Sequence, residues 1–208
     1  SNMPAHDVKK GTMKLLFPEF QPMRVKYKDI FNLKAFYEAL REWLVEHDWK
    51  DLEEGFDHWE TFYGERISQG GGREIWMQWR PTKEAEDLKI QYYLDIDWHC
   101  LGISSTEIVH NGKKIKTNKG EVELNIRAFI ERKYESEWAD HWFLKHFIKL
   151  FTNRIYNKDL ELREKELYQD VYAMQNFIKQ WFKMKRYLPY EETKSFFPSE
   201  AYPSHMKE

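Results

Sequence analysis

A segment near the middle of the chain alternates between apolar and more polar side chains with a period of two. Its apolar members are Leu88, Ile90, Tyr92, Leu94, Ile96 and Trp98. Because successive side chains of a β-strand point to opposite faces of a sheet, this alternation predicts a strand with one buried face. A strand buried on one face is typical of an antiparallel sheet, so other elements must cover its apolar side.

More strands are predicted around this segment because similar patterns recur between turn signals. Strand-like stretches cover residues 23–28, 56–67, 74–80, 108–110, 113–116 and 121–128. Asn111-Gly112 is a two-residue hairpin signal, and Gly70-Gly71-Gly72 predicts the tip of another hairpin. We expect a further turn at residues 118–120 and a polar loop at residues 82–87. Since no helical pattern separates the strands from residue 56 onward, the sequence predicts an antiparallel meander of five to six strands.

Helical periodicity precedes and follows the predicted sheet along the chain. After Asn32, a residue type favoured as an N-cap, apolar residues recur at helical spacing from Leu33 to Leu44. In the last third of the chain, one apolar stripe covers residues 138–155 and another covers residues 160–185. These patterns predict one helix before the central strands and long helices after them.

The order of these elements predicts the α+β class. The N-terminal helix and the long C-terminal helices would pack on the apolar face of the meander, in a helix-grip-like arrangement. We expect a flexible lead-in at residues 1–20, a single domain at residues 21–186 and an extended, proline-containing tail at residues 187–208. By analogy with other folds of this shape, a cavity between the sheet and the C-terminal helix would hold a ligand.

Composition excludes several classes of protein and favours a folded domain. Lysine plus arginine number 33 and aspartate plus glutamate 35, giving a net charge of −2, so nucleic-acid binding is not indicated by bulk charge. The single cysteine, Cys100, excludes an intramolecular disulfide and a cysteine-based zinc cluster. No stretch is apolar enough for a transmembrane segment, and we expect a cytoplasmic location. Aromatic residues make up 17 % of the chain, which is enough to build a large core.

One resemblance rests on residues 111–124, on the strand at residues 92–97 and on the helix at residues 33–49. With these segments the chain resembles a group of uncharacterised small archaeal proteins, and the similarity covers most of residues 25–185. The resemblance implies an intracellular domain. It implies no activity, cofactor or functional residue, so the candidate sites must come from the residues themselves.

Large rings on neighbouring predicted strands are the candidate ligand-binding residues. They are Trp79, Tyr92 and Trp98. Such rings either fill the core or line an apolar pocket, where the indole N–H and the phenol O–H would orient a ligand. Our first hypothesis is a non-enzymatic binding domain without a cofactor that holds a small apolar ligand.

The aromatic helix predicted at residues 138–155 supports an alternative function. Its candidate interface residues are Trp138, Trp142, Phe147 and Phe151. A helix of this kind can belong to the core, form the interface with a protein partner or with a second copy of the chain, or lie at a membrane surface. The alternative hypothesis is therefore a protein-interaction or self-assembly module.

A third hypothesis concerns the polar face of the central strand, where Asp95, Asp97 and His99 follow one another at alternate positions. Two carboxylates and an imidazole could bind a metal or act in acid–base catalysis of hydrolysis. A single strand presents its side chains in a row, so a metal site would need a further ligand such as Glu123 from a neighbouring strand. The simpler interpretation is a solvated outer face, and we expect no metal.

Overall fold

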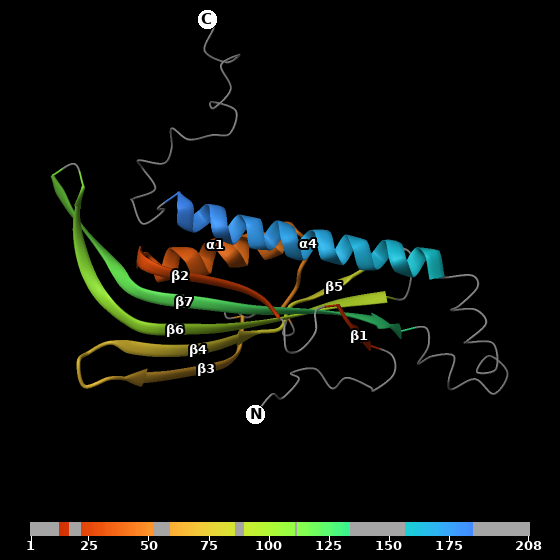
Figure 1. Ribbon diagram of the computed structural model, residues 1–208, viewed down its shortest axis with the longest axis horizontal. Coiled ribbons are helices and arrows are strands. Elements are labelled where there is room, and N and C mark those ends of the chain that lie inside the picture. Colours follow the sequence, from red (N-terminus) through yellow and green to blue (C-terminus); the bar gives the residue numbers. More distant parts are fainter. Residues whose placement is uncertain are drawn as a thin grey trace, which may run out of the picture.

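The computed structural model describes residues 13–16, 22–51, 59–85, 90–110, 112–133 and 157–184. In this part of the chain it shows one antiparallel sheet of seven strands and two helices on the same face of the sheet (Figure 1). The strands are β1 (Met13–Leu15), β2 (Met23–Phe31), β3 (Glu60–Ile67), β4 (Arg73–Trp79), β5 (Thr82–Glu84), β6 (Ile90–His110) and β7 (Lys113–Arg132). The helices are α1 (Leu33–Glu46) and α4 (Asn157–Lys183). The predicted α+β class and antiparallel sheet are confirmed.

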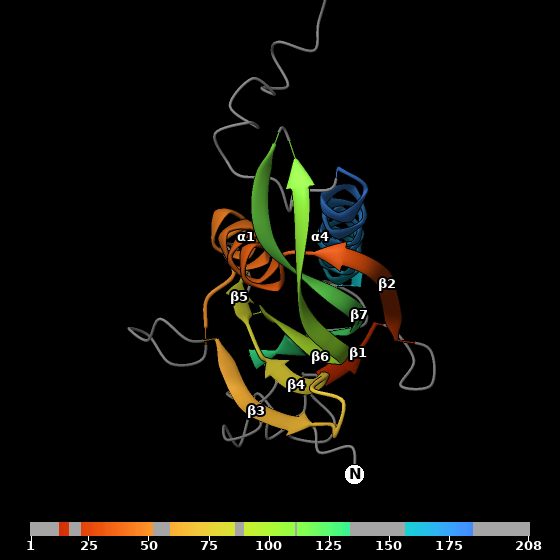
Figure 2. The ribbon, with the colours of Figure 1, turned by 90° about the vertical axis from the view of Figure 1, so that its left-hand side faces the viewer.

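The long hairpin of β6 and β7 forms the centre of the sheet. On one side, β1 and β2 both pair with β7, one after the other along its length. On the other side, β4 and β5 pair with β6, and β3 pairs with β4. The N-terminal strands therefore lie beside the last strand of the meander, and α1 and α4 run side by side over the sheet (Figure 2).

The sheet has seven strands where five to six were predicted, and two of the seven were not expected. In addition, the strands predicted at residues 88–98 and 108–110 both belong to β6, and those predicted at 113–116 and 121–128 both belong to β7. Met13–Leu15 was expected in the flexible lead-in, but it forms strand β1. Thr82–Glu84 was expected in a polar loop, but it forms strand β5. Each strand has three residues, too few for an alternating pattern to be recognised. Pairing with β7 and with β6 holds them in place.

The turn predicted at residues 118–120 is wrong, because these residues lie inside β7. Opposite them, the register of β6 shifts between Leu101 and Ser104, which marks a β-bulge. Gly102 in this bulge has a φ of 64°, a backbone conformation that glycine adopts without strain. Beyond the bulge, the far ends of β6 and β7 curl toward the face that carries the helices (Figure 1). The bulge at Gly102 thus bends the hairpin, and the predicted pairing of the two strands next to residues 111–112 is confirmed by the pair of His110 and Lys113. Asn111 itself lies outside the described residues.

Helix α1 begins where the sequence predicts. The side chain of Asn32 accepts a hydrogen bond from the backbone N–H of Ala35 at 3.0 Å, as an N-cap does. The buried residues of α1 are Phe36, Leu40, Trp43 and Leu44. This stripe packs against the sheet and against α4, whose buried residues include Leu167, Val171, Met174, Ile178, Trp181 and Phe182. Both amphipathic patterns are therefore confirmed as core-facing.

Aromatic rings connect the two helices with the sheet. Phe36 of α1 lies 5.2 Å from Trp98 of β6 and 4.9 Å from Trp181 of α4, measured between ring centroids. Tyr27 of β2 stacks on Phe182 of α4 at 4.2 Å. Offset and edge contacts of this kind stabilise a core beyond the burial of apolar area alone.

In the described part of the chain, neither helix combines the length and apolarity needed to cross a membrane.

Candidate functional site

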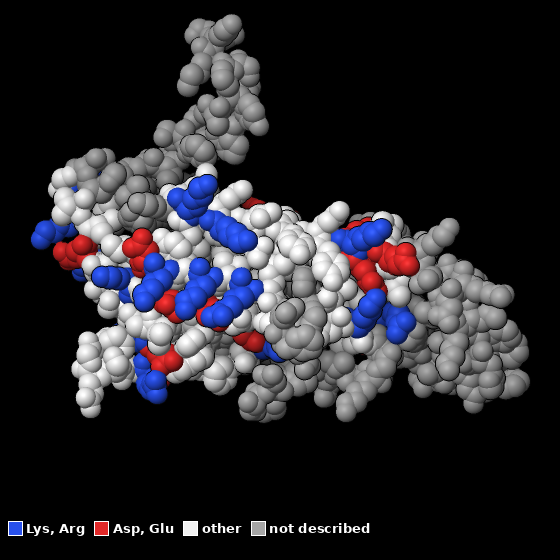
Figure 3. All heavy atoms as spheres, viewed as in Figure 1, with Lys and Arg blue, Asp and Glu red and all other residues white. Residues whose placement is uncertain are grey.

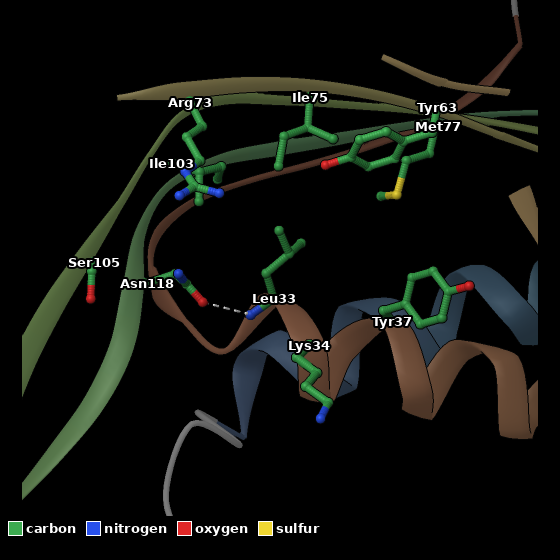
Figure 4. Close-up of a pocket in the computed structure, with 10 residues that line it drawn as sticks. All are labelled: Leu33, Lys34, Tyr37, Tyr63, Arg73, Ile75, Met77, Ile103, Ser105 and Asn118. Carbon is green, nitrogen blue, oxygen red and sulfur yellow. Dashed lines mark hydrogen bonds between the residues drawn. The ribbon is translucent and has the colours of Figure 1, made fainter. Parts of the chain in front are cut away.

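An open groove of about 460 Å³ lies between the first turns of α1 and the helix-covered face of the sheet (Figure 4). Its lining residues are Leu33, Lys34, Tyr37, Tyr63, Arg73, Ile75, Met77, Ile103, Ser105 and Asn118. This volume falls in the range of about 300–1,000 Å³ that is typical of small-molecule sites.

Three walls border the groove, and they are formed by strands β3 and β4, by helix α1 and by the β6–β7 hairpin. Side chains from β3 and β4, including Ile75 and Met77, point from the sheet toward α1 (Figure 4). Leu33 rises from α1 to meet them. The third wall is the curled end of the β6–β7 hairpin, which carries Ile103 and Asn118. The β-bulge therefore positions the site, since it brings the hairpin end next to the start of α1.

A hydrogen bond joins two of these walls. The side-chain Oδ1 of Asn118 in β7 accepts a hydrogen bond from the backbone N–H of Leu33 at 3.2 Å. The first N–H groups of a helix have no partner within the helix, so this contact and the Asn32 cap together satisfy two of them. The hairpin and the helix start are thereby held at a fixed spacing across the groove.

The groove is open at strand β3, which forms one edge of the sheet. Tyr63 and Ile67 of this strand are 53 % and 64 % exposed, although their cross-strand partners place them on the helix-covered face. The alternating apolar residues of β4 are buried, whereas those of β3 are not. An apolar surface next to a solvent-accessible edge is therefore available to a ligand.

Two phenol groups line the groove as neutral hydrogen-bonding groups. Burial raises the pKa of Tyr37 to about 12, and its hydroxyl accepts a hydrogen bond from the backbone N–H of Trp59 at 3.4 Å. The hydroxyl of Tyr63 donates to Glu65 at 3.0 Å, and burial together with this carboxylate raises the pKa of Tyr63. Both hydroxyls stay protonated near neutral pH, so they add polarity to the groove without adding charge.

The candidate ligand-binding rings lie behind the groove and do not line it. Trp79 and Trp98 are 0 % and 2 % exposed, and their centroids are 4.9 Å apart. Trp79 contacts the edge of Tyr37 at 4.8 Å, and Trp98 is the cross-strand partner of Met77. These two tryptophans therefore support the residues that form the groove.

The third ring, Tyr92, is placed elsewhere. It is 3 % exposed and lies near α4, where its hydroxyl is 3.5 Å from a carboxylate oxygen of Glu166. Burial is the main cause that raises its pKa. The structure thus brings Trp79 and Trp98 together and separates Tyr92 from them.

The candidate interface residues Trp138, Trp142, Phe147 and Phe151 lie outside the described residues. The interaction hypothesis built on them stays a prediction.

The polar face of β6 holds an ion-pair cluster. Arg80, which is fully buried, lies 3.3 Å from Asp95 and 2.6 Å from Asp97. Arg127 of β7 approaches the same two aspartates at 3.5 and 2.8 Å. Burial raises the pKa of Asp95, and both arginines oppose that rise. The expectation of a solvated face is wrong for Asp95, which is 1 % exposed because two arginines neutralise this buried position.

The other members of the third hypothesis are engaged in similar pairs. Nε2 of His99 is 2.9 Å from a carboxylate oxygen of Glu74 on β4, and the imidazole ring of His99 stacks on Trp76. Glu123, which the hypothesis needs as a further ligand, is paired with Arg24. Within the described residues, no group of three or more histidine, cysteine or acidic side chains could hold a metal ion.

A row of basic side chains marks the free edge of β2 (Figure 3). Arg24, Lys26 and Lys28 lie over Glu121 and Glu123, with Lys26 forming a 2.6 Å ion pair to Glu121. Charged side chains on an edge strand discourage pairing with another chain. Because the three cations share two carboxylates, most of the positive charge in this row is neutralised on the surface itself.

Several lining residues could not be recognised from the sequence. Arg73, Ser105 and Asn118 belong to segments that only the folded hairpins bring together. One usable signal was present, because a glycine within a strand indicates a bulge, and Gly102 lies four residues after the end of the predicted alternation at Trp98.

No family model, curated protein or solved structure matches this chain.

Proposed function

We propose that this protein is a non-enzymatic binding domain that holds a small, largely apolar molecule in the groove between α1 and the sheet. The observation that carries the proposal is an apolar lining within an open groove of about 460 Å³. The apolar members are Leu33, Ile75, Met77 and Ile103. Burial of apolar ligand surface at about 25 cal/mol per Å² would drive binding, and the polar groups at the rim would orient the ligand.

A helix-grip-like arrangement is part of this proposal. It is supported by the pairing of the N-terminal strand β2 with the last strand β7, and by a long C-terminal helix packed on the curled sheet. The ligand position differs from the one expected, because the described residues that line the groove come from α1 and not from α4.

A site at Asp95, Asp97 and His99 has less support. Arg80, Arg127 and Glu74 already occupy the polar atoms of these residues. A carboxylate held between two arginines is a poor metal ligand and a weak base, because both functions require its negative charge to be available.

Exposed residues give a better test of the groove than the buried tryptophans do. Trp79→Ala or Trp98→Ala would remove a core ring and destabilise the protein by about 3–5 kcal/mol, so lost binding could reflect unfolding. Ser104 and Ser105 are neighbouring exposed serines on β6, and only Ser105 lines the groove. Replacing each with tryptophan gives a matched pair.

The experiment measures binding of the neutral fluorescent probe N-phenylnaphthylamine. We expect the wild-type protein and Ser104→Trp to bind the probe with similar Kd values, and Ser105→Trp to raise Kd at least tenfold by filling the groove. Circular dichroism confirms that both variants are folded. Absence of probe binding to the wild type, or equal Kd values for the two variants, would refute the proposal.

A further inference from the structure

The charge of the groove differs from that of the whole chain. The protein carries a net charge of −2, yet the described residues that line the groove include Lys34 and Arg73 and no aspartate or glutamate. An anionic group on a bound molecule would therefore meet these two cations, whose own partners, Glu65 at 3.1 Å from Arg73 and Glu38 at 3.7 Å from Lys34, do not line the groove. Cations that line a site attract anions even when the bulk charge is negative.

Arg73 is placed to contact such a group. It lies at the start of β4, and its guanidinium points from the sheet toward the first turn of α1 and toward Asn118 (Figure 4). One of its nitrogen atoms, Nη1, is 3.1 Å from Glu65, and the side chain remains 58 % exposed. Since a guanidinium has five N–H donors, this single ion pair leaves donors available for a ligand.

Apart from Glu65, the groups near Arg73 that line the groove are compatible with an anion. The first turn of α1 contains no acidic residue, and Lys34 at its start is 84 % exposed. In Figure 4 the Lys34 side chain extends away from the strands, so it contributes long-range attraction while Arg73 is the direct contact. Asn118 and Ser105 add polar groups at the same end of the groove.

The apolar residues of the groove wall follow Arg73 along β4, in the direction away from Asn118 and Ser105. Ile75 and Met77 follow it at alternate positions of β4, so all three side chains share one face. Charge is thus located at one end of a continuous apolar strip. A molecule that matches this strip has an apolar chain with an anionic end.

We propose that the ligand is an amphipathic carboxylate, with its chain on Ile75 and Met77 and its carboxylate at Arg73. This inference rests on the proposed function, because it names the class of molecule that the same groove binds. An arginine recognises a carboxylate through paired N–H···O hydrogen bonds, which a neutral alcohol of the same length cannot reproduce.

Two probes that differ only in the end group test the inference. Decanoate and decanol are titrated by calorimetry, below their aggregation limits, into the full-length wild type and two variants. Arg73→Gln removes the proposed contact. Arg66→Gln is the matched control, because Arg66 lies on the same hairpin and is also paired with a glutamate, but it faces the opposite side of the sheet.

We expect the wild type and Arg66→Gln to bind decanoate about tenfold more tightly than decanol, the gain of one exposed charge-assisted contact. In Arg73→Gln this preference should be lost, while the affinity for decanol stays unchanged. Equal binding of both probes by the wild type, or a preference that survives in Arg73→Gln, would overturn the carboxylate inference and leave the proposed function standing. If neither probe binds, the groove does not hold apolar chains and both proposals fail.

Discussion

Burial changes the chemistry of single side chains in this protein, and Cys100 is the simplest case. Its thiol is fully buried on the helix-covered face of β6, and burial raises its pKa to about 12. A thiol reacts through its thiolate, so Cys100 should be inert in the native state. We expect Ellman's reagent to label it quickly in denaturant and slowly, over hours, in buffer at pH 8. Rapid labelling of the native protein would contradict this prediction.

Partners also change the pKa of a single carboxyl, that of the half-buried Glu74. The hydrogen bond from His99 is the largest cause that lowers the pKa of Glu74 below 4.5, and Arg66 contributes further. The resulting stability is fully present above the ordinary pKa and is lost as pH falls through the lower pKa of the folded state.

An NMR titration of the Glu74 side-chain carboxyl checks this shift. His99→Ala should raise the pKa of Glu74 toward 4.5, by more than Arg66→Gln does, because His99 is the larger cause. A pKa that does not change in His99→Ala would show that the hydrogen bond is not responsible.

At the scale of the elements, the bend of the β6–β7 hairpin depends on a close approach between its two strands. A Cβ atom at Gly120 would lie 2.7 Å from Cδ1 of Ile103 and 3.1 Å from the backbone oxygen of Gly102. We expect Gly120→Ala to destabilise the protein by about 1–3 kcal/mol, because such overpacking displaces side chain and backbone. It should also weaken probe binding, since Ile103 lines the groove.

Gly70 provides the control for this change. A Cβ atom there meets nothing within 4 Å, and the residue lies in the turn between β3 and β4. Urea denaturation should therefore find Gly70→Ala within about 0.5 kcal/mol of the wild type. If Gly120→Ala were equally neutral, the close approach would not be what holds the bend.

At the scale of the whole molecule, Arg80 links strands that are distant in sequence. It follows β4 directly and contacts Asp95 and Asp97 of β6, which Arg127 of β7 also contacts. Arg80→Gln would leave Asp95 buried with less compensation, and we expect it to lower the free energy of unfolding by about 3–5 kcal/mol. The pair of the exposed Arg66 with Glu74 serves as comparison, since Arg66→Gln should cost less than about 1 kcal/mol. Equal urea midpoints for the two variants would contradict a structural role of the cluster.

The parts of the fold that followed from the sequence are those with a long, regular pattern. The alternation ending at Trp98 identified the buried face of β6, and Asn32 identified the start of α1. The three-residue strands β1 and β5 were not predicted, because three side chains are too few to show an alternating pattern. At the candidate site, the sequence singled out Trp79 and Trp98, which are buried behind the groove, and it did not identify the residues that form the groove.

The sequence by itself determined which faces of the strands and helices are buried, because a side chain's orientation follows from its position in a local repeat. Tertiary structure decided where the groove lies, since Leu33, Arg73 and Asn118 meet only after the hairpin bends at Gly102. It also decided that Asp95 is buried, because Arg80 and Arg127 arrive from neighbouring strands. Both outcomes depend on strand register and curvature, which arise from contacts between distant segments and leave no periodic trace in the chain.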